Sequence, residues 1–217
     1  MDLASFLSNL SIYAIPALFA ITLHEVAHGW TARRFGDHTA ELLGRLSLNP
    51  LKHIDPIGTL LIPGLMLALH LPLFGWAKPV PVNLSEVRNP RRTAVLVAAA
   101  GPLANFAMAV LWCGILAVVL RLPIDDTLKN WLLLMARAGM LVNVALGVFN
   151  LIPIPPLDGG RVLAGLLPVR LSTALQRIEP VGMMIVIALS ATSALRFVFA
   201  PAYAAVNTAI RAVWVYP

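Results

Sequence analysis

LSIYAIPALFAITLHEVAHGW, residues 10–30, is the stretch that decides both the fold class and the candidate chemistry. Its only acidic or basic side chains are those of His24, Glu25 and His28, which form an HExxH motif. Residues four apart share a helix face, so both imidazoles can bind one metal ion, with the carboxylate beside them as a general base. Charged groups at membrane depth are costly and usually functional. The stretch therefore predicts a membrane helix that carries a hydrolytic metal site.

The composition is that of a membrane protein. Of the 217 residues, 59% are hydrophobic and 12% are charged, whereas a soluble domain is about half apolar and a quarter charged. No polar stretch is long enough for a second domain, so residues 1–217 are predicted to form a single membrane domain. Its core is expected over about 10–165 and its C-terminal helices over about 180–217. The first apolar stretch lacks a basic start and a small-residue cleavage site, so we do not expect a removable signal peptide.

The net charge of +6 does not indicate nucleic-acid binding. The Lys and Arg residues lie mostly between the apolar stretches and are not interleaved with aromatic residues. Such charges usually set the orientation of a membrane protein. Cys113, the only cysteine, cannot form an intrachain disulfide. We therefore expect the lipid bilayer as a partner and no nucleic acid.

Apolar runs define the expected fold. Five stand out by length, at residues 10–31, 57–76, 93–120, 131–152 and 180–199. Pro201 is expected to end the last run and to leave residues 203–215 as a tail too short to span. The second run contains Pro63 and Gly64, which are compatible with a turn inside the membrane. The prediction is an all-α polytopic helical bundle with about four spanning helices and one re-entrant segment; the alternative is that residues 57–76 span.

Positive charge follows the first, second and fourth apolar runs. The basic residues of these loops are Arg33, Arg34, Arg45, Lys52, Lys78, Arg88, Arg91, Arg92, Arg161, Arg170 and Arg177. If the second run re-enters, all three loops lie on the cytoplasmic side, as the distribution of Lys and Arg in membrane proteins favours. The N-terminus then lies outside, and the HExxH motif lies toward the cytoplasm.

Asp158 is the best candidate for a third metal ligand. A catalytic zinc site usually has three protein ligands and a water, and two histidines leave it incomplete. Prolines 153, 155 and 156 end the fourth run, and Gly159 and Gly160 allow a sharp turn beside Asp158. The predicted topology brings Asp158 and the histidines to the same side of the membrane. A glutamate third ligand is the alternative, but Glu41, Glu86 and Glu179 lie in no matching helical motif.

Several motifs resemble those of one protein family. They are HEVAH (24–28), GPLAN (101–105), NLIPIPPLDGG (150–160), GRLSLNPLKHIDPIGTLL (44–61) and GWAKPVPVN (75–83). With them the chain resembles the site-2 protease family of intramembrane zinc metalloproteases, in its compact bacterial and archaeal branch without PDZ or CBS domains. The resemblance implies one Zn²⁺ per chain, bound by His24, His28 and Asp158. It also implies that Glu25 activates the water and then protonates the leaving amine.

The resemblance further implies the biological setting. The expected function is regulated intramembrane proteolysis, in which peptide bonds in or near transmembrane segments of other membrane proteins are hydrolysed. The expected location is a prokaryotic cell membrane, with the protein crossing it several times and the active site toward the cytoplasm. Water must reach such a site, so a polar cavity between the helices is predicted.

Three further elements have open roles. Asn105 could stabilise the transition state or bind substrate backbone, or it could form a hydrogen bond between helices. Asn150 could bind substrate backbone or cap a helix end. Residues 75–83 contain Pro79 and Pro81, which disfavour helix, so they could pair with an unwound substrate or serve as a linker.

Two alternative functions come from other classes. A membrane metal transporter would need ligands along a pathway, and the apolar runs offer few besides the HExxH motif. A proteolytically inactive homologue that binds membrane proteins is disfavoured, because Glu25 and all three proposed ligands are present.

Overall fold

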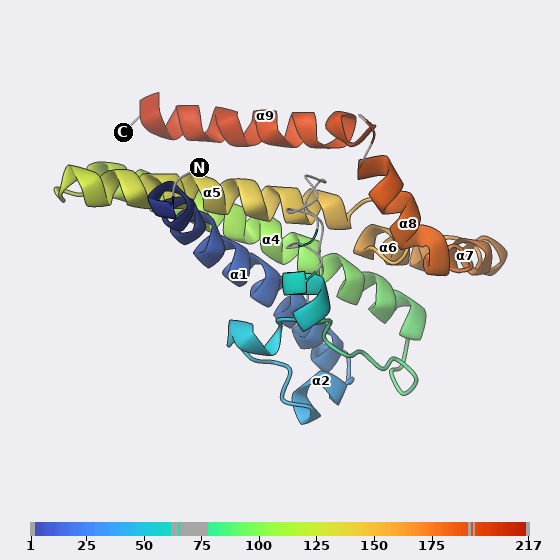
Figure 1. Cartoon of the computed structure of the whole chain (residues 1–217). Coiled ribbons are helices and arrows are strands. Elements are labelled where there is room, and N and C mark those ends of the chain that lie inside the picture. Colours follow the sequence, from blue (N-terminus) through green and yellow to red (C-terminus); the bar gives the residue numbers. More distant parts are fainter. Residues whose placement is uncertain (1–2, 62–64, 66–77, 191, 193, 216–217) are drawn as a thin grey trace.

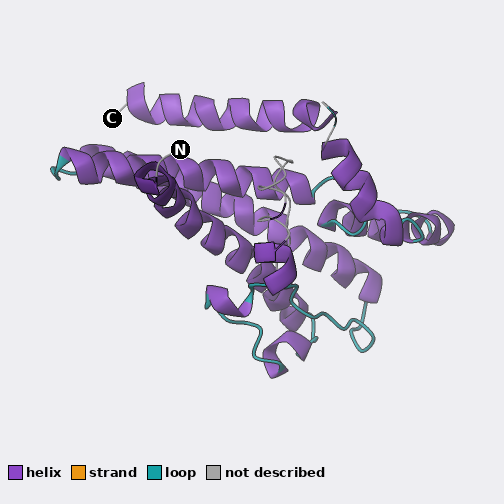
Figure 2. Cartoon of the chain, in the orientation of Figure 1, coloured by secondary structure: helices purple, strands orange, loops and turns teal. Residues whose placement is uncertain are grey.

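The structure is a computed structural model that describes residues 3–61, 65, 78–190, 192 and 194–215. Within this part of the chain, every element of regular secondary structure is a helix, as Figure 2 shows. The predicted all-α fold class is therefore confirmed.

Three long helices form the centre of the molecule. α1 (Leu3–Arg34), α4 (Pro90–Arg121) and α5 (Asp126–Asn150) pack against one another (Figure 1). Each is long and apolar enough to cross a membrane, which agrees with three of the predicted spans. Large apolar side chains such as Phe19, Leu103 and Val110 point outward from these helices, as expected for surfaces in contact with lipid.

The starts of α4 and α5 follow from their capping residues. The Asn89 side chain accepts a hydrogen bond from the Arg92 N–H, and Pro90 occupies the first turn of α4. The Asp125 carboxylate accepts from the N–H groups of Thr127 and Leu128 at the start of α5. Both residues satisfy backbone donors that a helix leaves unpaired at its N-terminus, so they fix where the two helices begin.

The C-terminal part differs from the prediction. The apolar run 180–199 is not one helix, because α8 (Glu179–Ser190) ends before α9 (Ala194–Val215) begins. Pro201 does not end a helix but lies inside α9. A proline removes one helical hydrogen bond, and α9 tolerates this loss because Val206 and Ile210 pack against α4 and α5. α9 runs alongside α5 in Figure 1.

A fourth crossing is available from two shorter helices. α7 (Val169–Gln176) and α8 are bent by 66° at a short break, and together they are apolar enough to count as one broken span. The number of candidate spans is therefore three, or four with this pair, among the residues that the structure describes.

Short helical turns lie between α1 and α4. They are α2 (Thr39–Leu42), the 3₁₀ turn η1 (Pro50–Lys52) and the π-helical turn η2 (Pro56–Leu61). The predicted re-entrant segment 57–76 falls mostly outside the described residues, so it stays a prediction. Residues 78–83 are described and form neither helix nor strand, as Pro79 and Pro81 predict.

Candidate metal centre

Three side chains from two helices meet at one point. His24 and His28 lie one turn apart on α1, and Asp158 is the first residue of α6 (Asp158–Leu166). The Asp158 Oδ2 atom lies 3.2 Å from His24 Nε2 and 3.3 Å from His28 Nε2, and the two Nε2 atoms are 3.1 Å apart. All three side chains are buried. The structure thus brings together the three residues that the sequence singles out as metal ligands.

The second ring nitrogen of each histidine meets an acceptor on α4. His28 Nδ1 lies 2.7 Å from the Val97 carbonyl oxygen, and His24 Nδ1 lies 2.6 Å from Asn105 Oδ1. A carbonyl oxygen can only accept, so the Nδ1 of His28 carries a proton, and in the neutral imidazole the lone pair then lies on Nε2. A lone pair on Nε2 is what a metal ion requires of a neutral imidazole.

Gly101 creates the space in which both imidazoles lie. A Cβ atom at this position of α4 would stand 2.4 Å from His28 Nε2 and 2.7 Å from His24 Cε1. Both distances are far below van der Waals contact, so only glycine allows α4 to approach the HExxH motif this closely.

Two further glycines bring Asp158 to the histidines. A Cβ on Gly159 would stand 2.2 Å from the Leu151 carbonyl oxygen, and one on Gly160 would stand 2.2 Å from the Pro155 nitrogen. The start of α6 therefore packs directly on the proline-rich backbone that follows α5. This close packing fixes the carboxylate of Asp158 where α6 begins.

The donor set fits a zinc ion. The ligand atoms of His24, His28 and Asp158 all lie within 4.8 Å of one another. Asp158 Oδ2 is buried and has no hydrogen-bond partner, and unpaired buried carboxylate oxygens are costly. Two Nε2 lone pairs that face each other at 3.1 Å also repel unless a cation lies between them. Two imidazoles and one carboxylate are typical protein ligands of catalytic zinc.

Glu25 contacts the segment 78–83. Its Oε2 accepts a hydrogen bond of 2.9 Å from the Val80 N–H. Arg45 holds the same segment by donating to the Lys78 carbonyl oxygen at 2.8 Å, and it also donates to the carbonyl oxygen of Lys52 in η1. The Lys78 N–H donates to the His53 carbonyl oxygen at 2.9 Å. The segment is thus fixed beside the HExxH motif.

Asp37 anchors the far end of this segment. Its carboxylate accepts from the N–H groups of Asn83, at 2.7 Å, and Thr39, at 2.9 Å. Burial raises the pKa of Asp37, but hydrogen bonds from the side chain and backbone of Thr39 and from the Asn83 backbone, together with the nearby His38, lower it more, so the net pKa is below the usual value. The carboxylate is therefore ionised at neutral pH, which strengthens both hydrogen bonds.

A cavity of about 920 Å³ is lined in part by His24, His28, Asp158 and Glu25. Pro79, Val80 and Val82 form part of one wall. Polar and charged residues farther along the lining are Arg91, Asn150, Arg161, Ser172, Thr173, Gln176 and Glu179. The cavity agrees with the predicted polar space between the helices.

The two asparagines differ in position. Asn150 borders the cavity, although its side-chain amide donates to the Leu146 carbonyl oxygen at 3.0 Å. Asn105 is fully buried and is not among the residues that line the cavity. Its contacts agree with the alternative in which Asn105 forms hydrogen bonds between helices.

Three contributions were not anticipated from the sequence. They are the space at Gly101, the acceptor at the Val97 carbonyl and the contact between Val80 and Glu25. The GPLAN motif drew attention to Gly101, but it did not indicate that Gly101 lies against the imidazoles of His24 and His28. A backbone carbonyl or N–H group has no sequence signal, so the other two could be found only from the structure.

The chain is similar to known zinc metalloproteases. A profile described as peptidase family M50 matches residues 121–193. A protein of Bacillus subtilis (strain 168), named "Putative zinc metalloprotease YwhC", is 35% identical over 196 residues, which cover 86% of this chain and 83% of that protein.

For two other relatives, the match covers a smaller share of the relative's length. "Putative zinc metalloprotease Rip2" of Mycolicibacterium smegmatis is 38% identical over 82% of this chain and 66% of its own. "Zinc metalloprotease MJ0392" of Methanocaldococcus jannaschii is 28% identical over 68% of this chain and 32% of its own. No solved structure matches the chain.

Proposed function

The chain belongs to peptidase family M50, the site-2 protease family, and from this premise we propose that it is an intramembrane endopeptidase. It is a zinc-dependent metalloprotease with helices apolar enough to span a membrane. The finer proposal is that it hydrolyses peptide bonds in or near transmembrane segments of other membrane proteins, on the cytoplasmic side of a prokaryotic cell membrane. The observation that carries it is a buried cluster of three possible metal ligands that line a cavity, two of them on a helix apolar enough to span a membrane.

His24, His28 and Asp158 are the proposed ligands of one Zn²⁺. The convergence of their donor atoms and the unpaired Asp158 Oδ2 support this assignment. Zinc bound at such a site would supply a water whose pKa is lowered to about 7, and it would polarise the scissile carbonyl.

Glu25 is the proposed general base and acid. Its carboxylate opens onto the same cavity as the ligands. It takes a proton from the attacking water as the new carbon–oxygen bond forms. It then gives that proton to the amide nitrogen as the carbon–nitrogen bond breaks, so the products are a carboxylic acid and an amine, which become carboxylate and ammonium when the acid proton passes to the amine. The hydrogen bond from the Val80 N–H keeps the Glu25 carboxylate in place beside the cavity.

The segment 78–83 is the proposed binding edge for the substrate backbone. Proteolysis needs an extended peptide, and an added strand is held by backbone hydrogen bonds. Pro79 and Pro81 have no N–H, and those of Lys78, Val80 and Asn83 are paired. Within the described residues, the Val82 N–H is the one backbone donor of this segment left without a partner, and Val82 borders the cavity.

Val82→Pro tests the edge, because it removes this N–H. We expect kcat/KM to fall about tenfold, the equivalent of one hydrogen bond of about 1.4 kcal/mol. Val82→Ala, the matched control, keeps the N–H and should stay within about twofold of wild type. Both are measured on the same reporter substrate. An equal fall of kcat/KM in the two variants would indicate that the Val82 side chain contributes to cleavage and that its N–H group does not bind the substrate backbone.

Cleavage of membrane-embedded substrates is the direct test of the proposed function. The full-length protein is reconstituted in liposomes with a pooled panel of single-span proteins tagged at both ends, and new termini are identified by mass spectrometry. We expect cuts within or close to the transmembrane segments. The member that is cut best then serves as the reporter substrate. Absence of cleavage by zinc-loaded protein across the panel would favour the inactive homologue.

Removal of zinc should abolish this cleavage. Treatment with a zinc chelator is expected to lower the reporter cleavage rate to background, and added Zn²⁺ should restore it, since the proposed base acts only on a zinc-acidified water. The measurement is the cleavage rate before chelation, after it and after zinc is added back. A rate that persists without zinc would contradict the metalloprotease mechanism.

A further inference from the structure

A chain of buried amides connects His24 to two neighbouring helices. Asn105 on α4 accepts from His24 Nδ1 through its Oδ1, at 2.6 Å. The Asn105 Nδ2 donates to the Ala20 carbonyl oxygen on α1, at 3.1 Å, and to Asn143 Oδ1 on α5, at 3.0 Å. Asn143 Nδ2 in turn donates to the Gly139 carbonyl oxygen, at 2.9 Å. Both asparagine side chains are fully buried.

The direction of this chain is fixed by its ends. The carbonyl oxygens of Gly139 and Ala20 can only accept, so the amide groups that face them must be NH₂ groups. Asn143 therefore presents its oxygen to Asn105, and Asn105 presents its own oxygen to His24. A reversed Asn105 amide would place its oxygen against two other acceptors.

This direction decides the tautomer of His24. Because Asn105 offers an acceptor, the Nδ1 of His24 must be the donor, and the lone pair then lies on Nε2. That nitrogen faces Asp158 and His28. His28 reaches the same state through the Val97 backbone carbonyl, so only His24 depends on a side chain for its orientation.

We propose that Asn105 and Asn143 are positioning residues that hold His24 in the tautomer and orientation that bind zinc. Asn105 acts directly on His24, and Asn143 fixes the direction of the Asn105 amide. The inference rests on the proposed zinc ligands and assigns Asn105 a role away from the substrate. Partners of metal-bound histidines typically change metal affinity 10–100-fold when they are removed.

Zinc affinity of the full-length protein in detergent, measured against a chelator without substrate, tests the proposal. Asn105→Leu should weaken zinc binding about 10–100-fold, because His24 loses its acceptor. Asn105→Asp should stay within about fivefold of wild type, because a carboxylate still accepts from Nδ1. Asn143→Leu should give a smaller loss than Asn105→Leu, since Asn105 keeps its bond to Ala20. Thr93→Val, which alters another buried polar residue of α4, should leave affinity unchanged.

Thermal unfolding of the metal-free variants separates positioning from helix packing. Asn105→Asp places a carboxylate beside the Ala20 carbonyl oxygen, so it should lower the melting temperature while it preserves zinc binding. If Asn105 only joined helices, Asn105→Asp would bind zinc as poorly as Asn105→Leu, and that result would overturn the proposal. If Asn105→Leu does not fold, the zinc affinities of Asn105→Asp and Asn143→Leu test the proposal. These readouts do not depend on proteolysis, so failure to find a substrate leaves them intact.

Discussion

Replacement of Glu25 by glutamine is expected to lower the rate of reporter cleavage about 10³-fold while the protein still binds zinc. A glutamine side chain cannot take a proton from water, and general acid–base catalysis typically contributes about 10²–10⁴-fold. The proposed ligands are unchanged by this substitution. Zinc content by elemental analysis and the cleavage rate are measured on the same preparation.

The structure indicates that Glu25→Gln leaves the fold intact. The carboxylate accepts one hydrogen bond, from the Val80 N–H, and the oxygen of a glutamine amide can accept the same bond. The loss of activity therefore reports on proton transfer and not on displacement of the segment 78–83.

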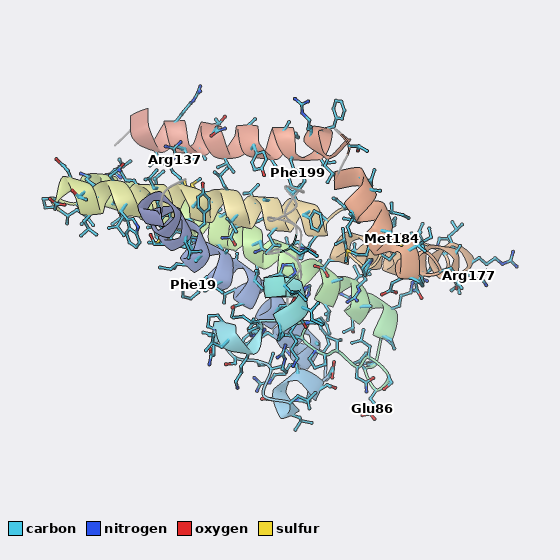
Figure 3. All side chains as sticks on the ribbon, in the orientation of Figure 1. Phe19, Glu86, Arg137, Arg177, Met184 and Phe199 are labelled. Carbon is cyan, nitrogen blue, oxygen red and sulfur yellow. The ribbon has the colours of Figure 1, made fainter. Side chains whose placement is uncertain are left out.

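Glu86→Gln is the matched control. Glu86 is exposed in the loop before α4 and points away from the helices in Figure 3. The same change of charge there should leave the cleavage rate and the zinc content at the wild-type level. Cleavage by Glu25→Gln within about tenfold of wild type would show that another group serves as the base.

Local signals were sufficient for the three central helices and for the pairing of His24 with His28. Apolar runs of membrane-spanning length predicted α1, α4 and α5, because every backbone polar group must be paired within a membrane. The spacing of His24 and His28 placed both rings on one helix face, which the structure confirms. Asp158 could be chosen because prolines marked the end of the fourth apolar run beside an acidic residue. The sharp turn expected at Gly159 and Gly160 is not found, because both glycines lie in the first turn of α6, where they allow close packing.

Apart from the meeting of Asp158 with the two histidines, contacts between distant segments could not be predicted. α1 and α4 are apolar on most sides, so their sequences do not define which face meets a neighbour. The pairing of Asn105 with His24 and the position of Gly101 against both imidazoles depend on how these helices rotate and cross. Proline was also an ambiguous signal, since Pro201 lies within a helix whose packing outweighs one lost hydrogen bond.

Gly101→Ala is expected to reduce zinc binding more than 100-fold and to abolish cleavage. The new Cβ would stand 2.4 Å from His28 Nε2, so either the imidazoles or α4 must move by about 1 Å to reach van der Waals contact. A shift of about 1 Å at a catalytic site can by itself cost about 10²-fold in rate. Because the same Cβ also approaches His24, no rotation of a single ring relieves the contact. Zinc affinity and cleavage are both measured.

Gly114→Ala on the same helix is the control for this substitution. A Cβ at Gly114 meets no atom within 4 Å, so the added methyl group faces open space. This variant should bind zinc and cleave the reporter like wild type, with equal or slightly higher thermal stability, because alanine favours helix over glycine by up to about 1 kcal/mol. The contrast between the two variants separates crowding of the imidazoles from the effect of glycine on helix stability. If Gly101→Ala matched Gly114→Ala in zinc affinity, α4 would not press on the HExxH motif, and the proposed geometry of the metal site would be wrong.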